Sequence, residues 1–238
     1  MALQGHSVPR RSVLGLSLGG AIATTLILPG CAKSDVADEG VSATEDLMRE
    51  HGVLRRLLVI CRESAAMLLA NAPSFDAGAL AATADLFKSF GEDYHERQLE
   101  EAHIFPAVRR THGEAANLID TLMAQHAQGR EVTTYIKDTC ASGRVPAAQV
   151  ERLSQTLVGF ARMYEVHAAY EDTIVFQAWK ATMSASQLRE VGDQFEDIEH
   201  TQFHGDGFDM AVDQVLQIEQ RLGLHDLGRY SASAPAPE

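Results

Sequence analysis

The sequence from Phe160 to Phe176 is FARMYEVHAAYEDTIVF, and this stretch decides the fold. Within and around it, residues that alternate in steps of three and four form one row, as expected for one face of a helix. The row consists of Leu153, Leu157, Phe160, Tyr164, His167, Glu171, Ile174 and Ala178. His167 and Glu171 therefore occupy core-facing positions, where a charged group is costly unless it is paired or bound to metal.

The spacing of His167 and Glu171 allows two interpretations. The two residues are four apart, so on a helix they are neighbours on the same face. An imidazole nitrogen and a carboxylate in this relation can bind one cation. A buried hydrogen-bonded pair explains the same motif, and the motif alone does not decide between them.

Length and composition limit the classes of protein. A chain of 238 residues, of which 45% are hydrophobic, is long enough for one large domain or two small ones. Its net charge of -13 makes nucleic acid an unexpected partner. Three scattered cysteines do not form a disulfide framework, whereas ten histidines exceed the number in an average domain and are a first indication of metal.

The N-terminal segment has the features of an export signal. Arg10 and Arg11 precede an uncharged apolar run that is shorter than the roughly twenty residues of a membrane span, and the arrangement resembles a twin-arginine signal. We therefore expect residues 1–30 to direct export and residues 31–43 to form a flexible tether. Cys31 is similar in position to the lipidated cysteine of a bacterial lipobox, which predicts a membrane-anchored lipoprotein. Release into the periplasm and an uncleaved anchor are the alternatives.

The remainder of the chain predicts an all-α fold. Residues 44–182 contain four amphipathic helical patterns joined by short connections, which predict an antiparallel up-down-up-down four-helix bundle. Residues 183–225 contain further amphipathic patterns and are expected to form a C-terminal helical extension. Residues 226–238 are expected to be a disordered tail.

Local signals predict where the helices begin. Thr44 is the expected N-cap of the first helix, and Ser74 or Asp76 can cap the second. Pro146 is well placed at the first turn of the fourth helix.

A histidine occupies a core-facing position on each helix of the predicted bundle. These residues are His51, His95, His126 and His167. One such histidine is usually a satisfied core residue, but four on four helices favour a metal site. Gly129, one turn after His126, leaves space in which a ligand could bind.

The second and fourth helices contain matching segments. Residues 100–107 and 171–178 both consist of two acids, two further residues, a β-branched residue, Phe, any residue and Ala. The match pairs Glu100 with Glu171, and one carboxylate from each half can bridge two metal ions held by imidazoles. Carboxylate and imidazole without thiolate favour iron or manganese over structural zinc.

The match is imperfect in its spacing. His95 precedes Glu100 by five residues, whereas His167 precedes Glu171 by four. On a regular α-helix the extra residue turns His95 about 100° further from the carboxylate, and a single π-bulge would restore the alignment. We favour His95 as the ligand because it continues the apolar row, with Glu96 as the alternative.

Taken together, these residues resemble the hemerythrin-like (HHE cation-binding) domain, whose pattern is His, H-x-x-x-E, His and H-x-x-x-E on four successive helices. The resemblance covers residues 44–181. It implies a non-haem di-iron centre, with manganese or mixed iron and manganese as the alternative. It also implies terminal imidazoles and bridging carboxylates, supplied here by His51, His95, His126, His167, Glu100 and Glu171.

Two departures from the oxygen carriers of that family bear on function. Arg130 takes the place of a second histidine on the third helix, and the fourth helix has H-x-x-x-E in place of H-x-x-x-x-D. Fewer histidines leave more coordination positions open, which weakens the case for reversible O2 carriage. The resemblance then implies sensing, binding or detoxification of O2, NO or peroxide. A di-iron oxidoreductase with catalase-like or NO-reducing activity and a non-catalytic iron-handling protein are the alternatives.

Further polar residues lie near these motifs. Tyr94, Tyr164 and Tyr170 are expected to pack in the bundle with hydrogen-bonded hydroxyls, and roles as ligands or relays are the alternative. His200 and His204 are spaced to bind a metal, but a position at a helix end is the favoured interpretation.

Overall fold

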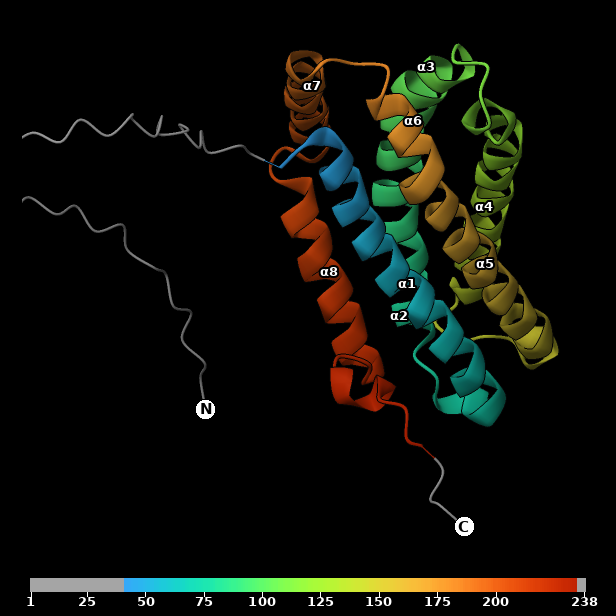
Figure 1. The fold of residues 1–238 in the computed structure, drawn as a ribbon. Helices are drawn as coiled ribbons and strands as arrows, with labels where there is room; N and C mark the ends of the chain where they lie inside the picture. The colour runs from blue at the N-terminus through green and yellow to red at the C-terminus, as the bar shows by residue number, and fades with distance from the viewer. Residues whose placement is uncertain (1–40, 235–238) are drawn as a thin grey trace, which may run out of the picture. The chain divides into compact units, whose positions relative to one another are not determined.

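The computed structural model describes residues 41–234, and every regular element within that range is helical (Figure 1). The all-α class predicted for this part of the chain is confirmed. The expected export signal over residues 1–30 and the lipidation site Cys31 lie outside the described residues, as does most of the expected tether. Among the described helices, none combines the length and the hydropathy that a bilayer span requires.

Four long helical rods pack against one another (Figure 1). The first rod is α1 (Ala43–Asn71) and ends in the 3₁₀ turn η1 (Ala72–Ser74). The second comprises α2 (Ala77–Leu86), η2 (Phe87–Ile104) and α3 (Phe105–Arg109). The third comprises η3 (Ala115–Asn117) and α4 (Ile119–Cys140). The fourth comprises η4 (Ala147–Gln149), α5 (Val150–Tyr170), η5 (Glu171–Val175) and α6 (Phe176–Lys180).

Side-chain caps fix the starts of the first two rods. Asp76, one of the two predicted caps, accepts the Ala79 N–H at 2.9 Å. The predicted cap Thr44 is wrong, because Ser42 has the extended backbone of an N-cap and accepts the Glu45 N–H, while Thr44 is buried inside the first turn. The hydroxyl groups of Ser42 and Thr44 can both cap a helix, so only the backbone conformation determines which of the two residues is the N-cap.

Two segments, η2 and η5, are π-helical at matching positions in the second and fourth rods. In a π-helix each N–H donates to the carbonyl five residues earlier. Phe105 N–H accordingly donates to Glu100 C=O, and Phe176 N–H donates to Glu171 C=O. Pro106 has no N–H, which removes one α-helical hydrogen bond next to η2. The π-helical segment η2 extends over 18 residues and is much longer than the single bulge that the sequence suggested.

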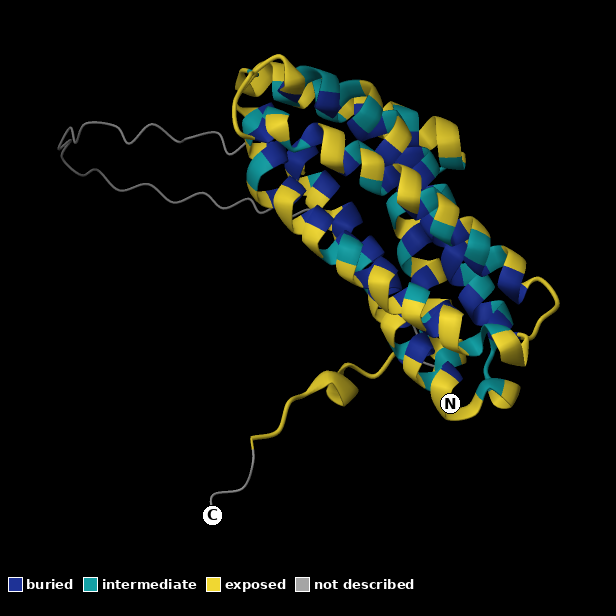
Figure 2. Cartoon of the chain, turned by 90° about the vertical axis from the view of Figure 1, so that its right-hand side faces the viewer, coloured by how far each residue is buried: buried dark blue, intermediate teal, exposed yellow. Residues whose placement is uncertain are grey.

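The apolar rows of the rods meet in one core. α1 packs most extensively against α5, and α2 packs against α4. The rings of Phe87, Phe160 and Tyr164 meet edge to face, with centroids 4.9, 4.8 and 5.0 Å apart. Full burial of such a side chain contributes roughly 1.5–3 kcal/mol. Buried residues, dark blue in Figure 2, follow the inward sides of the helices and leave the outer sides exposed.

Two more helices form an outer layer within the range expected for the C-terminal extension. α7 (Ala185–Phe203) begins at Ser184, which forms a capping box with Gln187. α8 (Gly207–Leu222) lies along α1 and α2 (Figure 1). Arg56 of α1 donates two hydrogen bonds, at 2.8 and 2.6 Å, to Glu219 of α8. This layer covers the α1–α2 side of the bundle.

Two local predictions differ from the structure. Pro146 has an extended ψ of 135° and lies immediately before η4, not inside the first turn. Leu227–Tyr230 form the 3₁₀ turn η6, although a disordered tail was expected from residue 226 onward. Asp226 caps this turn, and the Tyr230 hydroxyl donates to Leu224 C=O at 3.3 Å, so local hydrogen bonds order these residues.

The junction of α7 and α8 contains a buried carboxyl group whose protonation differs between the folded and unfolded chain. Glu199 Oε1 accepts the Phe208 N–H at 2.5 Å. Burial, followed by the nearby carboxylates of Glu50, Asp206 and Asp46, raises the pKa of Glu199 from 4.5 to about 7. The folded protein therefore holds the proton of the Glu199 carboxyl group more tightly than the unfolded chain does. The stability that this proton contributes is fully present below pH 4.5 and is lost as the pH rises to about 7.

We expect Glu199→Gln, which keeps the acceptor oxygen without a charge, to raise the melting temperature at pH 8 and to leave it unchanged at pH 4. Thermal unfolding followed by circular dichroism measures both values. Glu190→Gln, an exposed substitution on the same helix, is the control and should have no effect at either pH. An equal shift at both pH values would show that the charge of Glu199 is not the cause.

Candidate metal centre

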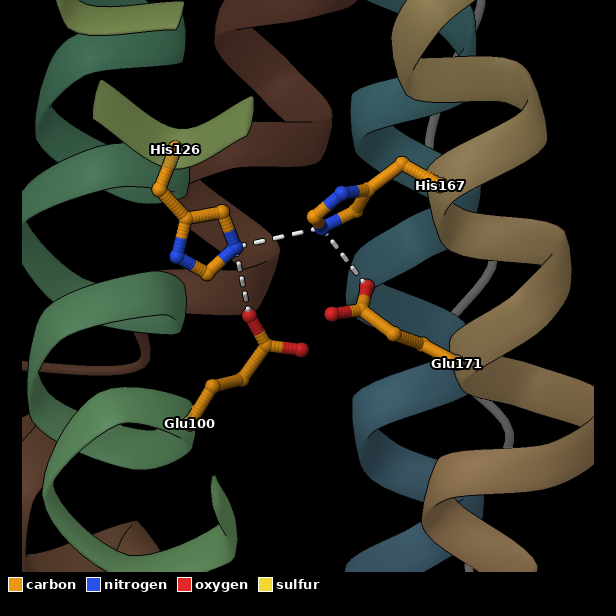
Figure 3. A group of neighbouring side chains, drawn as sticks. All are labelled: Glu100, His126, His167 and Glu171. Carbon is orange, nitrogen blue, oxygen red and sulfur yellow. Dashed lines mark hydrogen bonds and ion pairs between the residues drawn. The ribbon is translucent and has the colours of Figure 1, made fainter. Parts of the chain in front are cut away.

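The six residues predicted as metal ligands converge inside the bundle from all four rods. They are His51 on α1, His95 and Glu100 on η2, His126 on α4, His167 on α5 and Glu171 on η5. The most exposed of them is His167, at only 4%. Figure 3 shows four of the six residues, with Glu100 and His126 facing His167 and Glu171. The structure thus brings the predicted set together, and its role in metal binding remains a prediction.

The four imidazoles form two facing pairs. His51 Nε2 lies 3.0 Å from His95 Nε2, and His126 Nε2 lies 3.1 Å from His167 Nε2. Each pair joins two rods, the first with the second and the third with the fourth. All four Nε2 atoms therefore point into one volume.

Each carboxylate lies between the two imidazole pairs. Glu100 approaches one imidazole of each pair, with Oε1 3.3 Å from His95 Nε2 and Oε2 3.4 Å from His126 Nε2. Glu171 approaches the other two imidazoles through one oxygen, at 3.0 and 3.5 Å. Each carboxylate thus contacts one imidazole of each pair.

The oxygens of both carboxylates are buried without hydrogen-bond partners. Oε1 and Oε2 of Glu100 and of Glu171 accept no hydrogen bond, although imidazole nitrogens lie within ion-pair distance. A buried carboxylate that lacks partners is costly, so these four atoms require a positive charge beside them. Imidazole and carboxylate donors without thiolate are a ligand set for iron or manganese, and the residues present therefore fit such a metal.

The outward nitrogen of every imidazole is held by an acceptor. The Nδ1 contacts are His51 with Asp172 at 2.7 Å, His95 with Glu50 at 2.5 Å, His126 with Glu101 at 2.9 Å and His167 with Gln125 at 2.9 Å. An Nδ1–H that donates to these oxygens leaves the Nε2 lone pair directed inward, which is the usual arrangement of a metal-ligating histidine.

These supporting contacts link the rods in a ring. The fourth rod supports the imidazole of the first, the first supports that of the second, the second that of the third, and the third that of the fourth. Sequence reasoning missed all four supporting residues. They adjoin predicted ligands in the sequence, since Glu50 precedes His51, Gln125 precedes His126, Glu101 follows Glu100 and Asp172 follows Glu171. The repeated pair of acids, Glu100-Glu101 and Glu171-Asp172, could have identified two of the supporting residues. The first acid of each pair lies in the cluster, and the second contacts an imidazole of another rod.

Burial and the neighbouring charges shift the pKa values of three of the imidazoles, and not all in the same direction. Burial opposes the charging of His95, but the carboxylates of Glu100 and Glu50 outweigh it and raise the pKa of His95 well above its usual value. Burial also opposes the charging of His126, but neighbouring glutamates raise the pKa of His126 to about 10. Burial and the charge of His126 lower the pKa of His167 to about 4. A metal would displace the protons of His95 and His126, so binding and proton release are linked.

The two carboxylates also differ in their protonation. Although burial opposes ionisation, the imidazoles of His95 and His126 hold the pKa of Glu100 well below its usual value. Burial and the charge of Glu100 raise the pKa of Glu171 well above its usual value. Glu100 is therefore the carboxylate that ionises more readily, and Glu171 is the one that retains its proton more tightly.

The wide turns of η2 explain how His95 reaches the cluster. Residues five apart lie on one face of a π-helix, so His95 and Glu100 point the same way. Glu96, the alternative ligand, instead accepts the Tyr164 hydroxyl at 2.8 Å and Arg130 at 3.0 Å. The structure thus places His95 with the other imidazoles and Glu96 beside the cluster.

The space expected beside Gly129 is filled by a side chain. A Cβ on Gly129 would lie 1.9 Å from the Tyr164 hydroxyl oxygen, so this glycine accommodates Tyr164 and not a ligand. Tyr94 donates to Glu50 at 2.8 Å. Both tyrosines therefore pack with hydrogen-bonded hydroxyls, as expected, whereas Tyr170 is 47% exposed.

Two other groups lie outside the cluster. His200 is exposed, and His204 ends α7 in the left-handed conformation with φ of 57°. Within residues 41–234, neither belongs to a group whose ligand atoms could surround a metal, and the same holds for Cys61 and Cys140.

Comparisons with known proteins agree with this geometry. The family model described as the hemerythrin HHE cation binding domain matches residues 42–179. Three similar proteins, one from Mycobacterium bovis and two from strains of Mycobacterium tuberculosis, are each described as an uncharacterized protein. Each is 40% identical over 209 residues, which cover 86% of this chain and 81% of the relative. No solved structure shows significant similarity to the chain.

The contact between Gly129 and Tyr164 generates a prediction about stability. In Gly129→Ala the new methyl group must displace Tyr164 from its hydrogen bond with Glu96, and we expect a loss of about 1–3 kcal/mol in the free energy of unfolding. Chemical denaturation measures this value. Gly159→Ala is the matched control, because that exposed helical glycine has nothing within 4 Å of its Cβ position. A gain of about 0.5–1 kcal/mol is expected there.

A Gly129→Ala protein as stable as the wild type would contradict the close packing of Tyr164. Tyr164→Phe tests the contribution of the hydroxyl apart from that of the ring. This substitution removes both the hydrogen bond to Glu96 and the atom that lies closest to the Cβ position of Gly129.

Proposed function

The chain belongs to the hemerythrin HHE cation-binding family, and on this premise we propose that it is an exported non-haem di-iron protein that binds O2, NO or peroxide. The observation that carries the proposal is the set of four buried carboxylate oxygens without hydrogen-bond partners between two pairs of facing imidazole nitrogens. The antiparallel up-down-up-down order of the four rods is part of the same proposal.

Two metal ions suit this ligand set better than one. The imidazoles are already divided into two pairs, and Glu100 directs one oxygen toward each pair. Two ions would each receive two imidazoles and share the carboxylates of Glu100 and Glu171. The donor types favour iron, with manganese or a mixed pair as the alternative.

The chain's own residues determine what the centre can accept. A bound di-iron centre supplies two redox-active ions with coordination positions open to O2, NO or peroxide. Arg130 does not add a metal ligand, because its guanidinium group donates hydrogen bonds to Glu96 and Glu101. The buried aliphatic and aromatic wall excludes bulk water, and the four Nδ1 contacts hold the imidazoles in place. These features support binding of a small exogenous ligand.

The tyrosine next to the cluster favours a second candidate, a di-iron oxidoreductase. Tyr164 borders the inner space around the ligands and donates its hydroxyl hydrogen to Glu96. Turnover of peroxide or NO above the rate of free iron would identify that activity. A spectrum of the iron-loaded protein that is unchanged by O2, NO and peroxide would leave a non-catalytic iron-handling protein.

Metal content tests the ligand set directly. We expect about two iron ions per wild-type chain after reconstitution under anaerobic conditions, as for other two-metal sites. Glu100→Gln should lose most of this iron. The matched control is Glu92→Gln, which alters another buried glutamate of η2 that is hydrogen-bonded to Thr133 outside the cluster. Equal iron in both variants would contradict the bridging role of Glu100.

The choice of ligand on η2 has its own test. We expect His95→Ala to lose iron and Glu96→Ala to retain it, because His95 directs a nitrogen toward Glu100, whereas Glu96 contacts Tyr164 and Arg130. Metal analysis of both variants decides the assignment, and the reverse pattern would make Glu96 the ligand.

Export is proposed from the N-terminal motif. We propose that residues 1–30 direct twin-arginine export to the periplasm and that lipidation of Cys31 tethers the protein to the membrane. Replacement of Arg10 and Arg11 by lysine should retain the full-length chain in the cytoplasm, as measured by cell fractionation. Cys31→Ser should release an exported chain from the membrane fraction. Unchanged fractionation of both variants would contradict this proposal.

A further inference from the structure

A surface pocket adjoins the metal-site cluster at His167. The pocket has a volume of about 190 Å³ and lies between α4 and α5. Its lining includes Leu118, Leu122, Gln125, Val166, His167 and Tyr170. Val166 and Tyr170 are half exposed to solvent, at 51% and 47%, so the pocket is reached from outside.

His167 separates this pocket from the inner space of the cluster. The inner space is bordered by His51, His95, Glu100 and Glu171, and by His167 as well. Of the residues that line the two spaces, His167 is common to both. A molecule in the pocket is therefore divided from the carboxylates by the imidazole of one ligand.

The support of His167 differs from that of the other three imidazoles. Asp172, Glu50 and Glu101 hold their imidazoles with carboxylates, whereas the acceptor for His167 is the neutral amide of Gln125. Hydrogen bonds to a charged acceptor are roughly twice as strong as those between neutral groups. His167 is thus the imidazole held least firmly, and it is the one that borders the pocket.

The lining indicates which molecules the pocket accepts. Leu118, Leu122, Val166 and the ring of Tyr170 provide an apolar wall. The polar side chains in the lining are those of Thr121, Gln125 and His167, and the lining contains no lysine, arginine or acidic side chain. A water molecule occupies about 30 Å³ in the liquid, so the volume is ample for a diatomic molecule. A hydrated ion would lose its water without compensation at such a wall. The chemistry therefore selects small neutral molecules such as O2 and NO.

We propose that small neutral molecules reach the metal centre through this α4–α5 pocket and that the His167–Gln125 pair is its gate. The proposal rests on the proposed function, which it extends by naming the route and the class of ligand. Gln125 acts through His167 and is a positioning residue.

The first test compares two valines on the same helix. Val166 and Val158 are both exposed, at 51% and 50%, but only Val166 lines the pocket. In the iron-loaded full chain we expect Val166→Trp to slow the association of NO at least about tenfold in stopped-flow absorbance, with unchanged iron content, and Val158→Trp to leave the rate unchanged. Equal association rates in the wild type and both variants would overturn the proposal.

The second test changes the gate. Gln125→Glu gives His167 the same kind of support as the other imidazoles, and we expect slower NO association at unchanged iron content. An unchanged or faster rate would contradict the role of Gln125.

A third measurement does not depend on iron. In the metal-free full chain, dissolved O2 should increase the relaxation rate of the methyl resonances of Leu122 more than that of Leu57, which is fully buried in α1. Val166→Trp should remove the difference, and Val158→Trp should retain it. Absence of NO binding by the iron-loaded wild type would refute the proposed function, whereas equal O2 effects at Leu122 and Leu57 would refute the pocket.

Discussion

Four imidazole nitrogens face one another in two pairs, at 3.0 and 3.1 Å, around two buried carboxylates that accept no hydrogen bonds. Placing such groups in a dry interior costs several kcal/mol per charge, so the arrangement persists only with cations among them. Protons supply part of that charge in the metal-free chain, because the pKa values of His95 and His126 are raised. Each of the four rods contributes at least one residue to this cluster.

The ring of supporting contacts makes fold and site interdependent. Each rod holds the outward nitrogen of the next rod's imidazole, so the four helices are tied together by polar contacts as well as by the aromatic core. The π-helical turns of η2 and η5 contain Glu100 and Glu171, at matching positions in the second and fourth rods. A regular α-helix would turn His95 away from Glu100.

The pseudo-symmetry of the two halves is broken at His167. Three imidazoles are held by carboxylates and one by an amide, and the exception borders the pocket between α4 and α5. On the α1–α2 side, α8 covers the bundle and Arg56 joins it to Glu219. The cluster thus has a side that α8 covers and, at His167, a side that borders the pocket.

Much of this protein was determined by local sequence alone. Apolar residues at helical spacing located the four rods, and the polar residues in those rows identified His51, His95, His126, His167 and Glu171, because helical periodicity is a property of neighbouring residues. Glu100 was identified by the match between residues 100–107 and 171–178. Only the tertiary structure decided the rest. It set the cap at Ser42, the filling of the space at Gly129 by Tyr164, the extent of η2 and the supporting ring. The contact between His51 and Asp172 spans 121 residues of sequence, and such a contact depends on how separate rods pack, which no local pattern encodes.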